Sequence, residues 1–297
     1  MRLSRLLFAG FVATAVGLGS FPAAARTVEA VASISILADV VGQVGGSHVH
    51  VRSLVPADGD PHEYEPSPAD AKAVQAADVT FISGEGLEGW FSRLVKASGA
   101  KADAVVASVG INTRTMEEDG KTITDPHVWN SPINVIVWVA NIERTLSAID
   151  PDDAADFKAN AARYTKELRD LDAYAHARID AVAKDRRKVL TSHDALGYFG
   201  REYGVTFLAP LGLSTESEAS AADVAKLIDQ IKKEKVKVYF FENSNDPRLV
   251  KQIAAATGAE PGGELYVESL SEPNGPAPTY AKMFRYNVDK IAGAIAK

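Results

Sequence analysis

PDDAADFKANAARYTKELRDLDAYAHARIDAVAKD, residues 151–185, contains no glycine, and no proline after its first residue. Most of its residues are good helix formers, and many are charged. At 1.5 Å per residue, a helix of about thirty residues would span roughly 45 Å, which is longer than a helix inside one compact lobe needs to be. The segment therefore predicts a rigid helix that connects two lobes.

On both sides of this segment, short β-branched runs alternate with longer helical patterns. Before it we expect strands at 28–36, 49–55, 79–83 and 104–109, with helices at 37–44, 67–77 and 88–98. After it we expect strands at 188–191, 205–209, 236–242 and 265–267, with helices at 196–203, 219–233, 247–257 and 279–296. The predicted fold is α/β: two lobes, each a mostly parallel sheet flanked by helices, joined by one long rigid helix.

The first 25 residues have the pattern of a cleavable signal peptide. Arg2 and Arg5 precede an apolar run at 6–21, and small residues at 22–25 follow it. The chain has no cysteine, so lipid attachment to an N-terminal cysteine is excluded. We expect export to the periplasm as a soluble protein, with a retained membrane anchor as the alternative. The predicted domains are a signal peptide (1–25), an N-terminal lobe (26–150), a linking helix (151–185) and a C-terminal lobe (186–297).

Charge and cysteine usage limit the classes of function. The formal charge is −7, and loss of residues 1–25 removes two arginines and no acid, which makes it −9. An acidic exported protein is a poor partner for nucleic acid or anionic membranes. Without cysteine there are no disulfides, so stability must come from packing.

Three of the six histidines lie where a hydrophobic run gives way to turn residues. They are His62 in DPHEYEP (60–66), His127 in DPHVW (125–129) and His193 in LTSHD (190–194). Parallel-sheet proteins place ligand-binding groups at such positions. Any one of these histidines taken alone fits a hydrogen-bonded structural role, but together they suggest a metal held by imidazole nitrogens.

A tetrahedral zinc site needs a fourth ligand, and a carboxylate suits it. Glu268, in ELYVESL (264–270), lies at the end of a predicted strand of the second lobe. Glu63 and Glu65 are the alternatives, although loop or surface roles suit them better. With Glu268, each lobe supplies two ligands, so a metal would lie in the cleft between the lobes.

At this point the chain resembles the metal-binding solute-binding proteins of bacterial ABC importers, the group that carries zinc or manganese. The resemblance covers nearly all of the mature chain and rests on several segments in one order. These are DPHEYEPSPAD (60–70), DPHVW (125–129), TSHDALGYFGREYG (191–204), STESEASAADVAKLI (214–228) and FENSNDPRLVKQIAAATGA (241–259). The two-lobe fold with one long connecting helix that the resemblance implies agrees with the pattern described above.

The resemblance implies that His62, His127 and His193 bind the metal. A histidine at the third position accompanies zinc importers and a glutamate accompanies manganese importers, so His193 favours Zn²⁺ as the transported ion. The fourth ligand in this family is usually an aspartate, whereas this chain has Glu268. The implied partner is the membrane permease of an ABC transporter, with a periplasmic metallochaperone as a further candidate partner, and the implied state is a monomer.

Two segments depart from the family pattern. Ser131 replaces an acid after the second histidine, and we expect it to cap the following helix. The polar segment 114–124 has acids but lacks the histidines that many zinc-binding members carry, and we expect a surface loop there.

The remaining polar residues receive ordinary structural roles. We expect His48 and His50 to be exposed or partly packed, with a second metal site as the alternative, and His176 to face solvent. Asp194 and Ser192 are candidates for orienting the His193 ring. Finally, Asn243, Asn245 and Asp246 are expected to hold their loop rather than to touch metal.

The leading functional prediction is high-affinity zinc capture and delivery, without enzymatic activity. A manganese or other divalent-metal binding protein, or a metal-dependent adhesin, is the alternative. A secreted zinc hydrolase, with Glu268 or Glu63 as general base, is disfavoured because the sequence has no HExxH motif and no nucleophile elbow.

Overall fold

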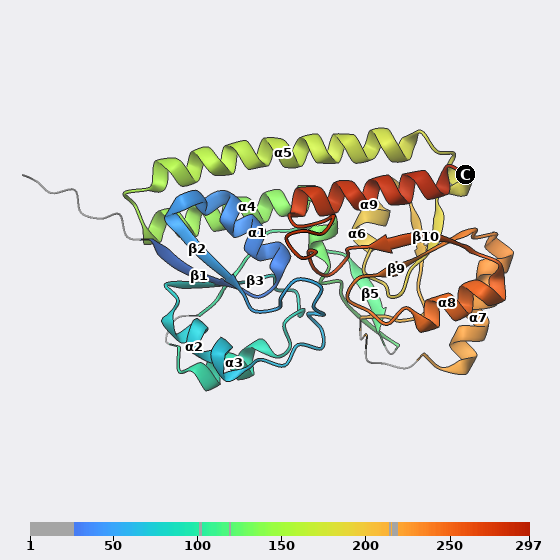
Figure 1. Ribbon diagram of the computed structural model, residues 1–297, viewed down its shortest axis with the longest axis horizontal. Helices are drawn as coiled ribbons and strands as arrows, with labels where there is room; N and C mark the ends of the chain where they lie inside the picture. Colours follow the sequence, from blue (N-terminus) through green and yellow to red (C-terminus); the bar gives the residue numbers. More distant parts are fainter. Residues whose placement is uncertain (1–26, 101–102, 119, 214, 216–218) are drawn as a thin grey trace, which may run out of the picture.

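Two parallel four-stranded sheets form the framework of the computed structural model, which describes residues 27–100, 103–118, 120–213, 215 and 219–297 (Figure 1). The N-terminal lobe contains the first sheet, in the order β2-β1-β3-β4, and the C-terminal lobe the second, in the order β10-β9-β7-β8. The strands are β1 (Val28–Ala32), β2 (Val49–Ser53), β3 (Val79–Ile82), β4 (Val105–Val106), β7 (Lys188–Leu190), β8 (Thr206–Leu208), β9 (Val238–Glu242) and β10 (Glu260–Leu265). The predicted signal peptide lies outside the described residues.

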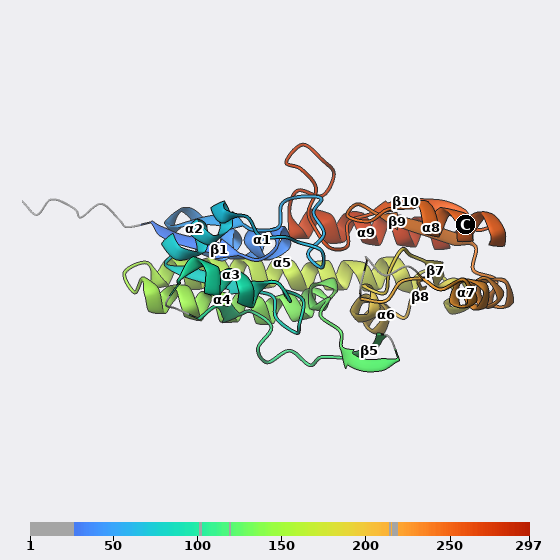
Figure 2. The ribbon, with the colours of Figure 1, turned by 90° about the horizontal axis from the view of Figure 1, so that it is seen from below.

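Helices cover the sheets in both lobes, as the alternating sequence pattern predicts (Figures 1 and 2). They are α1 (Ser35–Gly45), α2 (Pro68–Ala76), α3 (Phe91–Ser98), α4 (Pro132–Ile149), α5 (Ala154–Asp180), α6 (Gly197–Tyr203), α7 (Ala221–Glu234), α8 (Arg248–Thr257) and α9 (Tyr280–Ile295). The predicted α/β fold class is confirmed. The exact domain boundaries at residues 25, 150 and 185 stay predictions.

The predicted connecting helix is α5, a helix of 27 residues that runs along both lobes (Figure 1). Its buried side chains recur every three or four residues and form one apolar stripe, while the opposite face is charged. This stripe packs on α4 and α1 of the N-terminal lobe and on α9 and α6 of the C-terminal lobe. One hydrophobic core therefore continues through both lobes, and α5 covers it on one side.

The segment 114–124 is not the surface loop that we expected. It forms an antiparallel hairpin, β5 (Thr115–Glu118) and β6 (Lys121–Thr124), with Gly120 at its turn in a left-handed conformation (φ 71°). Met116 on this hairpin is buried. The Asp-Gly pair at 119–120 is a hairpin signal that was present in the sequence. Although it belongs to the first half of the chain, the hairpin lies beside α6 (Figure 2).

Several local predictions can be compared with the structure directly. Ser67 caps α2 in a capping box with Asp70, and Pro68 starts the helix, as expected. Ser131 occupies the N-cap position of α4, but its side chain makes no capping hydrogen bond, so the predicted capping role is wrong. The strand predicted at 265–267 ends at Leu265 and begins at Glu260.

The carboxyl ends of the strands lie where the two lobes meet. The Trp129 indole N–H donates to the Val267 carbonyl (2.7 Å), and the Tyr280 hydroxyl donates to the Trp129 carbonyl (2.8 Å). These buried hydrogen bonds join segments more than a hundred residues apart and hold the lobes in contact. Among the described residues, none of the helices combines the length and the apolar character that a membrane span needs.

Candidate metal centre

Four side chains from the two lobes converge at this junction. His62, His127, His193 and Glu268 each offer one ligand atom, and these atoms all lie within 4.8 Å of one another. His62 is in the loop after β2, and His127 follows β6. In the other lobe, His193 follows β7 and Glu268 follows β10. The structure thus brings together all four residues that the sequence singled out, two from each lobe.

The separations between the ligand atoms are short and similar. The Nε2 atoms of His62 and His127 are 3.2 Å apart. Glu268 Oε1 lies 3.2 Å from His193 Nε2 and 3.3 Å from His127 Nε2, and Glu268 Oε2 lies 3.2 Å from His62 Nε2. All three imidazoles therefore direct the same ring nitrogen toward one carboxylate.

The cluster is removed from solvent. The side chains of His127, His193 and Glu268 are fully buried, and that of His62 is 7% exposed. Burial raises the pKa of Glu268, but His127 and His62 beside it outweigh burial and hold the pKa well below its usual value. Burial lowers the pKa of His193, but Glu242 and Glu268 outweigh burial and hold it well above its usual value. The buried cluster therefore favours a negatively charged Glu268 carboxylate and a positively charged His193 imidazole in the metal-free protein.

Asp125 orients the His127 ring. One of its carboxylate oxygens, Oδ1, accepts hydrogen bonds from His127 Nδ1 (2.7 Å) and from the His127 backbone N–H (3.0 Å). Its other oxygen contacts the Arg114 guanidinium. Burial would raise the pKa of Asp125, but His127 and Arg114 hold it below its usual value. A proton fixed on Nδ1 leaves the Nε2 lone pair free for a metal.

Glu242, at the end of β9, does the same for His193. Glu242 Oε2 lies 2.5 Å from His193 Nδ1, and Oε1 accepts from the backbone N–H groups of Ser192 (3.0 Å) and His193 (3.2 Å). Asn245 donates to Glu242 Oε2 (2.9 Å). Sequence reasoning missed Glu242 and proposed Asp194 and Ser192 instead. The Ser192 hydroxyl has no hydrogen-bond partner, so that part of the prediction is wrong.

His62 is held differently. Its backbone N–H donates to Asp60 Oδ1 (2.8 Å), and the carbonyl of Pro61 accepts from the Trp90 indole (2.9 Å). Among the described residues, no side chain or carbonyl hydrogen-bonds to its Nδ1. His62 and Glu63 are among the residues that line a hollow of about 230 Å³. The backbone around His62 is fixed, but its ring lacks a carboxylate partner behind it.

The alternative carboxylate ligands do not reach the cluster. Glu63 and Glu65 are exposed, and Glu63 Oε1 accepts a hydrogen bond from Thr215 (2.9 Å). Asn243 donates to Asp58 (2.8 Å) and Ser269 (3.0 Å), so it holds the loops together as expected. Glu268 is therefore the one acid among the described residues that faces all three histidines.

The other histidines fall outside this centre. The two ring nitrogens of His48 contact different carboxylates, Asp153 (2.7 Å) and Asp156 (3.1 Å), so the ring bridges these acids at the start of α5. His50 is exposed and pairs with Glu29. His176 does not simply face solvent as expected, because its ring packs against Tyr203 with the ring centres 4.9 Å apart.

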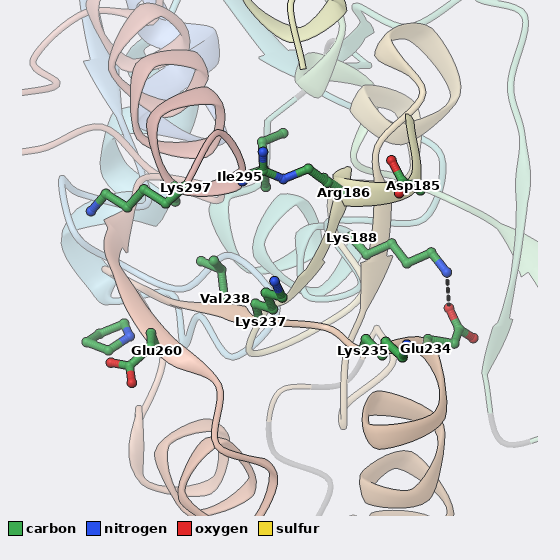
Figure 3. A pocket seen from close by; sticks show the side chains of 12 residues that line it. Asp185, Arg186, Lys188, Glu234, Lys235, Lys237, Val238, Glu260, Ile295 and Lys297 are labelled. Atoms are coloured by element: carbon green, nitrogen blue, oxygen red, sulfur yellow. Dashed lines mark ion pairs between the residues drawn. The ribbon is translucent and has the colours of Figure 1, made fainter. Parts of the chain in front are cut away.

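A hollow larger than the one beside His62 lies elsewhere in the described part of the chain. It has a volume of about 510 Å³ and opens at the amino ends of β7, β9 and β10, the opposite edge of the sheet from the metal centre (Figure 3). Five cationic and three acidic side chains line it, and the Lys188 ammonium pairs with Glu234 (3.2 Å). Its lining contains no histidine and more cations than acids, so it does not compete with the histidine cluster as a metal site.

Comparison with known proteins agrees with this geometry. Residues 30–294 match the family model ZnuA, described as zinc-uptake complex component A, periplasmic. The chain is 32% identical over 284 residues to the manganese ABC transporter substrate-binding lipoprotein PsaA of Streptococcus mitis (93% of this chain, 91% of the relative). It is 33% identical over 288 residues to the iron ABC transporter substrate-binding lipoprotein MtsA of Streptococcus pyogenes serotype M1 (94% and 92%).

Solved structures show the same fold. A serine-to-alanine mutant of the Mn-bound periplasmic metal binding protein from Candidatus Liberibacter asiaticus superposes with a TM-score of 0.84 at 32% identity, over 91% of this chain and 100% of that one. The periplasmic zinc binding protein TroA from Treponema pallidum gives a TM-score of 0.85 at 27% identity, with the same coverage.

These relatives are substrate-binding components of transporters and not enzymes, which excludes the hydrolase alternative. Such components work with a membrane permease and an ATPase. The fold, the relatives and the family match over residues 30–294 lead to one conclusion. The chain belongs to the ZnuA family and is a metal-binding substrate-binding component of an ABC importer.

Proposed function

We propose that this protein captures zinc through His62, His127, His193 and Glu268 and delivers it to an ABC permease. The observation that carries the proposal is the separation of the ligand atoms, 3.2–3.3 Å for the four pairs described above. A tetrahedral zinc ion with bonds of about 2.0–2.1 Å would place its ligand atoms about 3.3 Å apart. A small adjustment of the side chains would complete the shell.

The chemistry of the ligands favours zinc as cargo. Three imidazole nitrogens and one carboxylate oxygen form a borderline ligand set that suits zinc better than a set rich in oxygen would. Four protein ligands also leave no open position for a metal-bound water to be activated, so the ion would be held and not used for chemistry. The family description and the zinc-binding relative TroA support this choice.

Manganese is the second candidate, and a specific observation favours it. Both oxygens of Glu268 face histidines, Oε1 toward His127 and His193 and Oε2 toward His62. A carboxylate that binds through both oxygens would raise the coordination number above four, which manganese prefers. Relatives named for manganese and iron fit this alternative.

We further propose that residues 1–25 direct export to the periplasm and are removed there. The basic start, apolar run and small residues support this, as does the family description. The predicted monomeric state and the predicted metallochaperone partner stay predictions.

Zinc titration with a competing chelator tests the proposed function. We expect one tightly bound ion per chain, and loss of tight binding in the double variant His62→Ala, His193→Ala. Affinity weaker than about micromolar, or affinity that the double variant retains, would contradict the proposal. Parallel titrations with manganese separate the two metals: zinc should displace bound manganese, and the reverse result would make manganese the cargo.

A further inference from the structure

Arg114 links the metal centre to the opposite lobe. It immediately precedes β5 in the N-terminal half of the chain, yet its side chain lies against α6 of the C-terminal lobe. Its backbone N–H donates to the Tyr198 hydroxyl (3.2 Å), and this hydroxyl donates to the Asp125 carbonyl (2.8 Å). The guanidinium itself contacts Asp125 Oδ2. Backbone and side chain of Arg114 therefore both fix the segment that carries His127.

Gly197, the first residue of α6, provides the space for this contact. A Cβ atom at Gly197 would overlap the Arg114 guanidinium and would come within 2.9 Å of Asp125 Oδ2. The backbone of Gly197 does not lie in the left-handed region, so its conformation alone does not require glycine. The close approach of the guanidinium requires it. The N-terminal end of α6 is thus shaped to hold an arginine from the other lobe.

Asp125 transmits this contact to the metal ligand. Asp125 Oδ2 accepts a hydrogen bond from the Arg114 guanidinium, and Oδ1 accepts hydrogen bonds from the His127 ring and from the His127 backbone N–H. Asp125 and His127 are fully buried, so no water competes for these oxygens. With both oxygens engaged, the plane of the carboxylate is fixed, and with it the direction of His127 Nε2.

The two orienting carboxylates differ in where their own support comes from. Glu242 is held within the C-terminal lobe, by Asn245 and by the backbone of Ser192 and His193. Asp125 pairs with Arg114 of its own lobe, and residues across the junction support this pair: the guanidinium lies against Gly197, and the Tyr198 hydroxyl donates to the Asp125 carbonyl. Loosening of the junction would therefore release the support of His127 and leave that of His193 intact.

We propose that Arg114 is a positioning residue for metal retention: seated over Gly197 of the opposite lobe, it fixes Asp125 and through it the His127 ligand, and so slows release of the bound ion. This inference rests on the proposed function. It adds that the rate of metal release depends on a contact between the lobes that no ligand makes itself.

Metal release from Arg114 variants tests the inference. Zinc-loaded native protein and Arg114→Gln are mixed with excess chelator, and the dissociation rate is followed. Loss of a group that supports a metal ligand typically costs 10–100-fold in affinity, so we expect release about tenfold faster. Arg114→Lys keeps the charge without the planar fork and should recover part of the slow release. Gly197→Ala, which displaces the guanidinium from the other side, should accelerate release as Arg114→Gln does.

Arg201→Gln is the matched control. Arg201 lies over the same Tyr198 ring (4.9 Å) and also reaches the other lobe, at the Asn112 carbonyl (3.3 Å), but it has no contact with Asp125. The Arg201→Gln variant should therefore release zinc at the same rate as the native protein. The absorption spectrum of the cobalt-loaded site gives a second readout, because it reports ligand geometry: it should change in Arg114→Gln and stay unchanged in Arg201→Gln.

The inference would be overturned if Arg114→Gln released zinc at the rate of the native protein and its cobalt spectrum were unchanged. Equal acceleration by Arg201→Gln would also overturn it, since the effect would then come from general loosening of the lobes. The proposed function fails separately: in that case the native protein itself would not bind zinc tightly. If the native protein binds zinc tightly but the Arg114 variants release it at the native rate, the inference is wrong and the proposed function still stands.

Discussion

The three histidines of the metal centre are supported in two different ways. His127 and His193 are fully buried, and each has a carboxylate, Asp125 or Glu242, behind its ring at 2.5–2.7 Å. His62 is in a loop, is slightly exposed, and has no such partner among the described residues. Its ring nitrogen contacts the other ligands directly and little else.

This difference separates two tasks of a capture site. Buried imidazole–carboxylate pairs hold their rings in the binding orientation before any ion arrives, so little ordering is needed on binding. A ring that lacks such a partner must be ordered by the ion or by the other ligands. We therefore expect His62 to contribute mainly to affinity for the ion, and His193 to contribute to both affinity and folding stability.

The largest expected difference concerns the stability of the metal-free protein. His193→Ala leaves the Glu242 carboxylate buried without its imidazole, and breaking a buried pair in this way costs about 3–5 kcal/mol. His62→Ala leaves no such carboxylate behind the ring, so its loss should be much smaller. Urea unfolding of both variants, followed by circular dichroism, measures the difference.

His50→Ala is the control for this comparison, because His50 is exposed and pairs only with Glu29. Its unfolding free energy should match that of the native protein within about 0.5 kcal/mol. Equal losses for His62→Ala and His193→Ala would remove the distinction between the two kinds of support.

The next effect concerns metal affinity. Glu242→Gln is nearly isosteric, but it removes the charge behind His193 and weakens the hydrogen bond that fixes the ring. Mutation of such an outer carboxylate typically costs 10–100-fold in affinity. Chelator competition measures the loss, and the matched variant Glu63→Gln, an exposed acid beside His62, should bind with nearly native affinity. A larger loss for Glu63→Gln would mean that the mouth of the site controls binding.

Much of the fold could be predicted from sequence because its signals are local. The glycine-free run at 151–185 and the alternation of strand and helix patterns indicated two parallel sheets and a connecting helix. The hairpin at 115–124 was missed because its strands are short and polar, and Met116 is the only buried residue among the described residues of these strands. The way α5 covers one continuous core also depends on packing between distant segments, which no local pattern reports.

The candidate site shows the same limit. His62, His127 and His193 were found because each follows a strand or precedes a turn in a distinctive local context. Glu242 was missed because its relation to His193 exists only in three dimensions, across 49 residues and between two neighbouring strands. The acid that ends β9 was visible in the sequence, but an acid at the end of a strand does not reveal which histidine it will face.

A smaller effect is expected from pH. The raised pKa of His193 stabilises the metal-free fold fully below the unfolded value near 6.5, and this contribution is lost as pH rises through the folded value. The lowered pKa of Glu268 acts oppositely: its contribution is present above the usual value of 4.5 and is lost as pH falls through the folded value. Because zinc needs a neutral imidazole, affinity should rise with pH, with release of a proton from His193.

Calorimetric titrations in buffers of different ionisation enthalpy count this proton. We expect about one proton released per zinc near neutral pH, and an affinity that changes by at most about tenfold per pH unit for each proton displaced. His193→Ala should release fewer protons than the native protein. If His193→Ala releases as many protons as the native protein, His193 is not the source of the proton and the assignment is wrong.

The smallest effect is expected at Asp60, which supports the backbone of His62 and not its ring. Asp60 Oδ1 accepts the His62 N–H (2.8 Å), and Oδ2 lies 2.8 Å from the Thr215 hydroxyl oxygen, which is also 2.9 Å from Glu63 Oε1. Asn at this position keeps an oxygen for the His62 N–H, while its amide group can donate to the freely rotating threonine hydroxyl, which is also an acceptor. Zinc affinity of Asp60→Asn should therefore fall less than about tenfold, the lower end of the range for groups that support a ligand. A loss as large as that of Glu242→Gln would show that the loop around His62 is held as firmly as the buried imidazoles, and the three histidines would then differ in exposure alone.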